Sequence, residues 1–232
     1  MEYKTTSIII QARSTSKRFP GKIHEKIGQK TILQMVIDVC NKAAAYVNSY
    51  TSRHGVVCGV ALAIPEGDEV SKLYSRYTII SGDENDVLSR YKKAADKLGS
   101  DFIVRITSDC PLIPDFIICK AINFATRDGL DYLTNADPRY RTSPDGHDVE
   151  VISRKLLDWL NENANEGHRE HVTSYLIKNR PSWAKCRNIV GYTDFSALKI
   201  SVDTKEDLIR LQEMHDKISN ICKDLGGDKY RL

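Results

Sequence analysis

The chain has 232 residues, a length that fits one or two domains. Hydrophobic residues make up 41% of it and charged residues 28%, which is typical of a folded protein and too apolar a composition for a disordered one. Lys plus Arg number 34 and Asp plus Glu 31, so the net charge of +3 gives no reason to expect a nucleic acid or a membrane surface as partner. No apolar run approaches the roughly 20 residues that span a bilayer, and we expect no secretory signal.

Six cysteines are spread along the chain, and no two of them form a Cys-x-x-Cys pair. Neither a zinc site nor a thioredoxin-like redox motif is therefore predicted. Several lie in apolar segments, where a free thiol behaves as a small core residue. We therefore predict a reduced, cytoplasmic protein. The six are Cys40, Cys58, Cys110, Cys119, Cys186 and Cys222.

Strand-like and helix-like segments alternate through the first half of the chain. The apolar patterns predict strands at 7–10, 56–64, 78–80 and 102–106, and helices at 31–46, 69–77 and 85–98. This order of elements predicts a parallel sheet with helices on both faces.

The pattern changes after about residue 130. We predict strands at 131–134 and at 148–152, the latter half-exposed because polar and apolar residues alternate, and a helix that Ser153 caps and that ends at Asn163. A buried strand is predicted at 198–202, followed by a helix to about Ile218 that opens on Thr204–Asp207, which resembles a capping box. These patterns divide the chain into a core, 1–134 with 198–232, and an inserted α+β arm, 135–197.

The loop that follows the first strand, residues 11–22, is rich in hydroxyl groups and cations. In an open α/β sheet ligands lie beyond the carboxyl ends of the strands, and such a loop there can surround a polyphosphate. It is not a Walker A loop, because Ile23 stands where Ser or Thr is needed to meet magnesium. A solvated basic loop is the alternative. The four cations are Arg13, Lys17, Arg18 and Lys22.

Two further strand ends carry a carboxylate, Asp109 and Asp203. Each is a candidate magnesium ligand, and each is alternatively a turn or cap residue. Two carboxylates and a cationic loop are the minimum for nucleotidyl transfer, in which a metal bridges phosphate oxygens and cations neutralise the leaving pyrophosphate.

The arm has its own polar cluster. Alternation along the strand places Asp148 and Glu150 on one face, and Arg169 and His171 follow later in the chain. These side chains are candidates for holding hydroxyls, an amine or an acidic group of an acceptor, with surface ion pairing as the alternative for each.

Six stretches of the chain, in order, resemble the bacterial cytidylyltransferases that make CMP-sugars. The nearest branch is the spore-coat polysaccharide biosynthesis cytidylyltransferases, and CMP-Kdo and CMP-sialate synthetases are more distant. The stretches are 8–22 (IIIQARSTSKRFPGK), 82–91 (GDENDVLSRY), 104–112 (VRITSDCPL), 144–151 (PDGHDVEV), 169–173 (REHVT) and 202–208 (VDTKEDL).

This resemblance implies a Rossmann-like nucleotide-diphospho-sugar transferase fold, a mixed but mostly parallel sheet flanked by helices. It implies a nucleotide-binding core, and an inserted arm that binds the acceptor and often makes a homodimer. The implied reaction joins CTP to an acceptor, gives a CMP-acceptor and pyrophosphate, and uses Mg²⁺.

The resemblance also assigns roles by motif. Asp109 and Asp203 are implied to bind Mg²⁺ and, with Lys22 and Arg13, to carry catalysis. Thr107 and Ser108 stand where CMP-Kdo synthetases have Gln-Gly before the metal Asp, so the preference for cytosine stays open. The residues implied to contact the nucleotide are Gln11, Ala12, Arg13, Ser16, Lys17, Lys22, Arg90, Thr107, Ser108 and Asp109.

The acceptor is open. A sugar acid used in surface polysaccharide or glycoconjugate synthesis is one reading, and a phosphate or phosphonate acceptor is another. A metal-dependent glycosyltransferase of the same fold is disfavoured, because Cys110-Pro111 follows Asp109 where those enzymes carry Asp-x-Asp. A non-catalytic nucleotide-binding subunit is the third reading.

Overall fold

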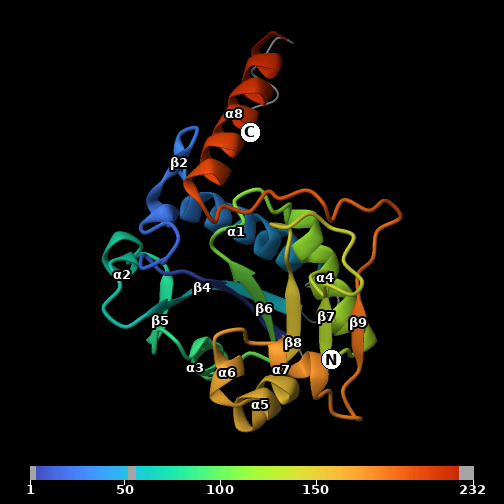
Figure 1. Cartoon of the computed structure of the whole chain (residues 1–232). Helices are drawn as coiled ribbons and strands as arrows, with labels where there is room; N and C mark the ends of the chain where they lie inside the picture. Colours follow the sequence, from blue (N-terminus) through green and yellow to red (C-terminus); the bar gives the residue numbers. More distant parts are fainter. Residues whose placement is uncertain (1–3, 52–55, 225–232) are drawn as a thin grey trace.

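A seven-stranded mixed sheet organises the chain, in the order β5-β4-β1-β6-β8-β7-β9 (Figure 1). The structure is a computed structural model that describes residues 4–51 and 56–224. Strands β5, β4, β1 and β6 run parallel, and β8 runs antiparallel to both β6 and β7. The predicted mixed, mostly parallel fold is therefore confirmed. The strands are β1 Lys4–Gln11, β4 Val56–Pro65, β5 Thr78–Gly82, β6 Phe102–Thr107, β7 Tyr132–Thr134, β8 Glu150–Ser153 and β9 Cys186–Asn188.

Helices cover both faces of this sheet, because its inner strands are apolar on both sides. In β1, Ile8 and Ile10 pack into the core beneath α1 and α4, whereas Ile9 packs into the core beneath α3 and α5. These four helices are α1 Ile32–Thr51, α3 Val87–Leu98, α4 Asp115–Asp128 and α5 Arg154–Asn163. The remaining elements are the short η1 Lys22–His24, β2 Lys26–Ile27, β3 Lys30–Thr31, α2 Val70–Leu73, α6 Glu166–Arg169 and α7 Ser174–Lys178, and the long α8 Lys205–Asp224.

Local sequence signals explain several helix ends. Asp86 caps α3 by accepting a hydrogen bond from the backbone N–H of Ser89, and Gly99 ends that helix in the left-handed conformation. Ser153 caps α5 by accepting from Leu156 N, as predicted. Helix α8 starts beside β2 and runs away from the body of the molecule, and it ends six residues beyond the predicted end at Ile218.

Several elements differ from the prediction. Strand β8 is buried along its whole length rather than half-exposed, because it lies between β6 and β7 inside the sheet. Residues 198–202 form no strand and make only an isolated bridge, between Asp145 and Lys199. The helix expected over 69–77 is the shorter α2, and α4, α6, α7 and β9 were not predicted. Strands β8 and β9, from the arm, belong to the same sheet as the core, and the division at 135–197 stays a prediction.

A glycine brings the segment after the arm close to the loop that precedes β8. Gly146 has φ +115°, and a Cβ there would lie 2.6 Å from the backbone nitrogen of Ser201. Ile200 N and Ser201 N both donate to the carbonyl of Asp145, at 2.7 and 3.0 Å. Only glycine combines this backbone conformation with so close an approach, so part of the motif at 144–151 is explained by folding rather than by ligand binding.

Within the described ranges the cysteines are free thiols, most of them buried, as the sequence indicated, and the side chain of Cys222 lies outside the description. None of the helices in those same ranges is both long and apolar enough to cross a bilayer.

Candidate active site

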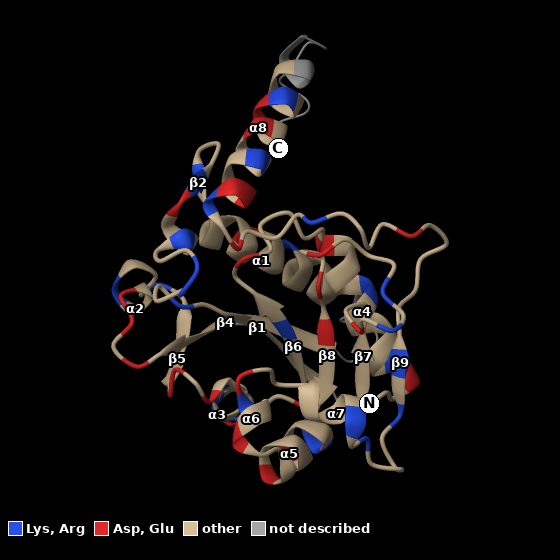
Figure 2. Ribbon diagram, in the orientation of Figure 1, with Lys and Arg blue, Asp and Glu red and all other residues tan. Residues whose placement is uncertain are grey.

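The loop after β1 is folded into a fixed shape. The carboxylate of Asp68 accepts hydrogen bonds from the backbone nitrogen and the hydroxyl of Ser14, both at 2.8 Å. Gly21, in the left-handed conformation, then starts η1 and donates its N–H to the carbonyl of Ser14 at 2.9 Å. The turn directs the side chain of Lys22 inward, where it is 10% exposed. Figure 2 shows the cations of this loop beside the carboxyl edge of the sheet.

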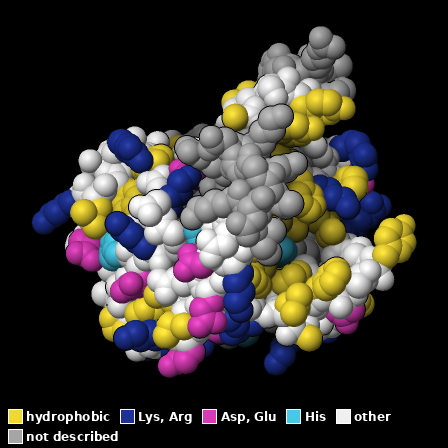
Figure 3. Space-filling view, turned by 90° about the horizontal axis from the view of Figure 1, so that it is seen from above, with side chains coloured by type: hydrophobic (Ala, Val, Ile, Leu, Met, Phe, Trp, Pro, Cys, Tyr) yellow, Lys and Arg dark blue, Asp and Glu magenta, His cyan; other side chains and the backbone are white. Residues whose placement is uncertain are grey.

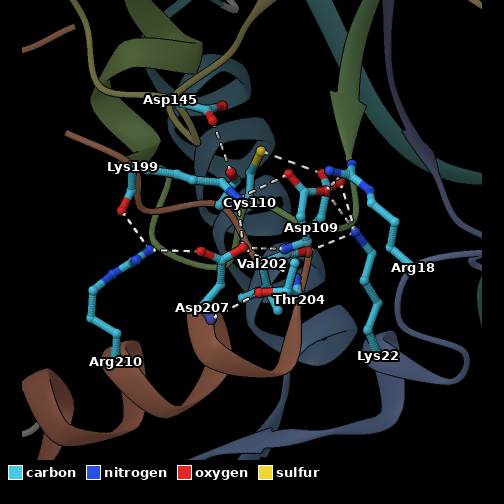
Figure 4. Close-up of polar contacts among 12 residues, drawn as sticks. Arg18, Lys22, Asp109, Cys110, Asp145, Lys199, Val202, Thr204, Asp207 and Arg210 are labelled. Carbon is cyan, nitrogen blue, oxygen red and sulfur yellow. Dashed lines mark hydrogen bonds and ion pairs between the residues drawn. The ribbon is translucent and has the colours of Figure 1, made fainter. Parts of the chain in front are cut away.

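Lys22 joins the two carboxylates that the sequence singled out. Its ammonium nitrogen lies 3.0 Å from Asp109 Oδ2, 3.4 Å from Asp203 Oδ1 and 2.6 Å from the carbonyl oxygen of Val202 (Figure 4). Arg18 adds a second cation, 2.8 Å from Asp203 Oδ1. The backbone explains the convergence, because Val202 N donates to the carbonyl of Asp109 at 2.8 Å.

Electrostatics keep Asp109 ionised in this position. Burial by itself would raise the pKa of the carboxyl, but the charge of Lys22 and hydrogen bonds from Thr107 and Lys22 outweigh burial and hold the pKa below its usual value. A carboxylate that stays charged at neutral pH is available to bind a cation.

These groups border a cavity of about 320 Å³, which we call the basic cavity. Nearly all the residues that the resemblance implied for the nucleotide line it, and Ala12 and Arg90 do not. Arg90 is 1% exposed and donates instead to the carbonyls of Asp83 and Glu84. The lining residues are Gln11, Arg13, Ser16, Lys17, Arg18, Lys22, Thr107, Ser108, Asp109 and Asp203.

The oxygen set fits a hard divalent cation. The carboxylates of Asp109 and Asp203 and the carbonyl of Val202 are oxygen ligands of the kind that Mg²⁺ takes. The described part of the chain has no group of three or more His, Cys, Asp or Glu side chains arranged for a metal. A metal here would therefore complete its coordination with water or with oxygens of a bound phosphate.

Asp207 was not proposed as a site residue, yet it positions Asp203. Its Oδ2 accepts from the backbone nitrogens of Asp203 and Thr204, at 3.0 and 3.1 Å, and from Lys199 Nζ at 2.5 Å. Thr204 Oγ1 in turn accepts from Asp207 N at 3.3 Å, which completes the predicted capping box. Figure 4 shows this carboxylate beside the Lys22 cluster. The capping pattern in the sequence was the signal for this role.

A second cavity, of about 380 Å³, lies beside the C-terminal ends of β7 and β9. We call it the arginine cavity, because Arg139, Arg180 and Arg187 line it. Glu150, Tyr132 and Thr173 form part of its wall, and the hydroxyls of Tyr132 and Thr173 both donate to the carboxylate of Glu150.

Of the four residues predicted to bind an acceptor, only Glu150 lines this cavity. Asp148 is paired with Arg141, and Arg169 donates to the capping carboxylate of Asp86 at 2.7 Å and to Asn161. His171 is exposed and lines neither cavity. Asp148 and Arg169 have structural partners and, like His171, lie outside this cavity, so they are not part of the acceptor site that we propose.

Comparisons with known proteins agree with this geometry. A family model described as cytidylyltransferase matches residues 7–225. The spore coat polysaccharide biosynthesis protein SpsF of Bacillus subtilis is 27% identical over 218 residues, 90% of this chain and 85% of that protein.

Solved structures give the same fold. A cytidylyltransferase from Leptospira borgpetersenii superimposes with a TM-score of 0.77 and 26% identity, over 94% of this chain and 97% of that one. The synthetase of CMP-2-keto-3-deoxy-manno-octonic acid, solved with CTP, gives 0.68 at 16% identity, over 92% and 99%, and shows a shared fold. Because the family model covers nearly the whole chain, this protein belongs to the cytidylyltransferase family.

Proposed function

We propose that this protein transfers CMP from CTP to an acidic, hydroxyl-bearing acceptor and releases pyrophosphate. The observation that carries the proposal is the cluster of Lys22, Asp109 and Asp203 at the border of the basic cavity. Two carboxylates suited to a divalent metal lie there beside cations suited to a triphosphate, and this combination supports the proposal.

We assign different roles to the residues of the basic cavity. Asp109 and Asp203 would hold Mg²⁺, which supplies Lewis-acid polarisation of the phosphates. Lys22, Arg13 and Lys17 bind the phosphates and stabilise charge on the departing pyrophosphate. Thr107 and Ser108 are then left for the nucleoside, at the end of β6.

We place the acceptor in the arginine cavity. Its three arginines suit a carboxylate, phosphate or phosphonate, which guanidinium groups bind with two parallel hydrogen bonds. Such a group would replace Asp137 as the partner of Arg139 and Asp128 as the partner of Arg187. The hydroxyls of Tyr132 and Thr173 both donate to Glu150, so their lone pairs are left to accept from hydroxyl groups of the ligand. An acidic sugar or a polyol phosphate has this combination of groups, and an acidic oxygen that attacks CTP needs no general base.

Exposed apolar side chains support a homodimer as part of the proposal. Tyr140, Val190, Tyr192, Phe195 and Leu198 are each at least 50% exposed. Their two loops are joined, because Phe195 N donates to the carbonyl of Thr142 at 2.8 Å. Figure 3 shows hydrophobic side chains gathered on the face from which α8 projects. Light scattering of the purified chain tests this assembly.

Pyrophosphate release, measured with each of the four ribonucleoside triphosphates and a panel of acidic sugars, polyol phosphates and phosphonates, tests the function. We expect release only with CTP, Mg²⁺ and an acidic acceptor, and loss of release on chelation of the metal. Arg187→Ala should raise the KM for the acceptor and leave the KM for CTP unchanged. Release without any acceptor, or turnover of a nucleotide sugar instead of CTP, would contradict the proposal.

A further inference from the structure

A row of polar side chains crosses the sheet between the two cavities. Gln11, Arg105, Glu150 and Tyr132 come from the adjacent strands β1, β6, β8 and β7 and lie on the face that α3 and α5 cover. Strand register brings them together, since Gln11 is level with Thr107, and Arg105 is paired with Glu150. Gln11 lines the basic cavity, and Glu150 and Tyr132 line the arginine cavity.

The contacts along this row are continuous. Arg105 donates through NH1 to Glu150 Oε2 and through NH2 to Gln11 Oε1, the latter at 3.4 Å. Glu150 Oε1 accepts from the hydroxyls of Tyr132 and Thr173, the latter at 2.5 Å. Glu150 is 4% exposed, so solvent hardly screens its interaction with Arg105.

The charges of this row are fixed at neutral pH. Burial would raise the pKa of Glu150, but the charge of Arg105 and the hydrogen bonds from Thr173 and Tyr132 hold the pKa below its usual value. Burial, and then the charge of Glu150, raise the pKa of Tyr132 well above its usual value. The pair is therefore ionised, and the phenol keeps the proton that it donates.

The pair also decides which way the amide of Gln11 faces. A side-chain amide has one accepting and one donating end, and its two orientations are nearly equal in size. Because a guanidinium can only donate, Arg105 draws the carbonyl end of Gln11 toward itself and leaves the NH₂ group for the basic cavity. That group is then set to donate to an oxygen of a bound nucleotide.

We propose that the buried Arg105–Glu150 pair is a positioning element that holds the side-chain amide of Gln11 in the orientation that binds CTP. Glu150, which belongs to the wall of the arginine cavity, acts through Arg105. The inference rests on the proposed function, since it takes CTP as the ligand of the basic cavity. A buried ion pair is seldom more stabilising than apolar residues of the same volume, so stability alone gives little reason for one here. Its two ends reach residues of two different cavities, which a purely structural pair would not require.

A double-mutant cycle on CTP binding tests the inference without any acceptor. Calorimetry would measure the Kd for CTP with Mg²⁺ in the wild-type chain, in Glu150→Gln, in Gln11→Ala and in the double variant. We expect each single substitution to weaken binding about threefold to tenfold, the range of one hydrogen bond. The double variant should bind no more weakly than Gln11→Ala alone, because Glu150 acts through Gln11.

Two further variants serve as controls for this experiment. Asp148→Asn removes the carboxylate of a nearby ion pair that lines neither cavity, and it should leave the Kd unchanged. If Glu150→Gln fails to fold because Arg105 loses its counter-charge, Arg105→Met with Glu150→Gln removes both charges at once. That variant should show the same weakened binding as Glu150→Gln is expected to show.

The outcomes separate the two proposals. Wild-type affinity in the folded Glu150 variants, or effects of Glu150→Gln and Gln11→Ala that simply add, would overturn the inference and leave the proposed function standing. A wild-type chain that binds no CTP would refute the proposed function, and the inference with it.

Discussion

The contribution of the Asp207 carboxylate to folding stability can be tested directly. Hydrogen bonds from Lys199 and from the backbone nitrogens of Asp203 and Thr204 outweigh burial and lower the pKa of Asp207 from 3.8 to about 2. A shift of this size corresponds to about 2 kcal/mol of folding stability at neutral pH. Asp207→Asn removes the charge and keeps the shape. We therefore expect the free energy of unfolding to fall by about 2 kcal/mol at pH 7.

The pH dependence follows from the sign of the shift. Because the folded pKa is below the unfolded one, the contribution is complete well above pH 3.8 and is lost as the pH falls through about 2. At pH 3 the wild type should exceed the variant by only about half the difference seen at pH 7. Urea unfolding at both pH values measures this, with Glu213→Gln, an exposed acid further along α8, as control. A difference that is absent at pH 7, or equal at both pH values, would refute the reasoning.

Three other predictions concern the site and its support. Asp109→Asn and Asp203→Asn should each reduce pyrophosphate release at least about a hundredfold in a chain that still folds, and near wild-type rates in either would remove that residue from the metal site. Lys22→Ala should raise the Kd for CTP in calorimetry at least about tenfold, and an unchanged Kd would argue against a phosphate contact. Gly146→Ala should cost about 2 kcal/mol or more in urea unfolding, since its Cβ would meet the backbone of Ser201, and wild-type stability would contradict this.

The residues of the basic cavity were predicted from the sequence because they were expected at the carboxyl ends of strands. For one of them, Asp203, the expected strand is absent. Asp109 does follow a buried strand, as predicted. Asp203 was expected at the end of a strand over 198–202, which does not form. It reaches the site because the preceding residue, Val202, is hydrogen-bonded to the carbonyl of Asp109, and because Asp207 fixes its backbone. The motif specified the residue, and tertiary contacts supply its position.

The acceptor residues show where local patterns stop being informative. Alternation along 148–152 placed Asp148 and Glu150 on one face, but β8 begins only at Glu150, and Asp148 instead meets Arg141 in the preceding loop. Nothing in the sequence states that Arg139 and Arg187 share a cavity, since that depends on the pairing of β7 with β9. A signal was nevertheless present, because a charged residue within an apolar strand needs a buried partner.

That requirement ties the fold to the site. Arg105 is opposite Glu150 only in the observed register of β6 and β8. A slip of one residue would turn Glu150 to the other face of the sheet and leave the guanidinium buried without a counter-charge. The same slip would break the row from Gln11 through Arg105 to Glu150, so the two cavities would no longer be joined by hydrogen bonds. The pair therefore selects the strand register and, through it, the distance between the basic cavity and the arginine cavity.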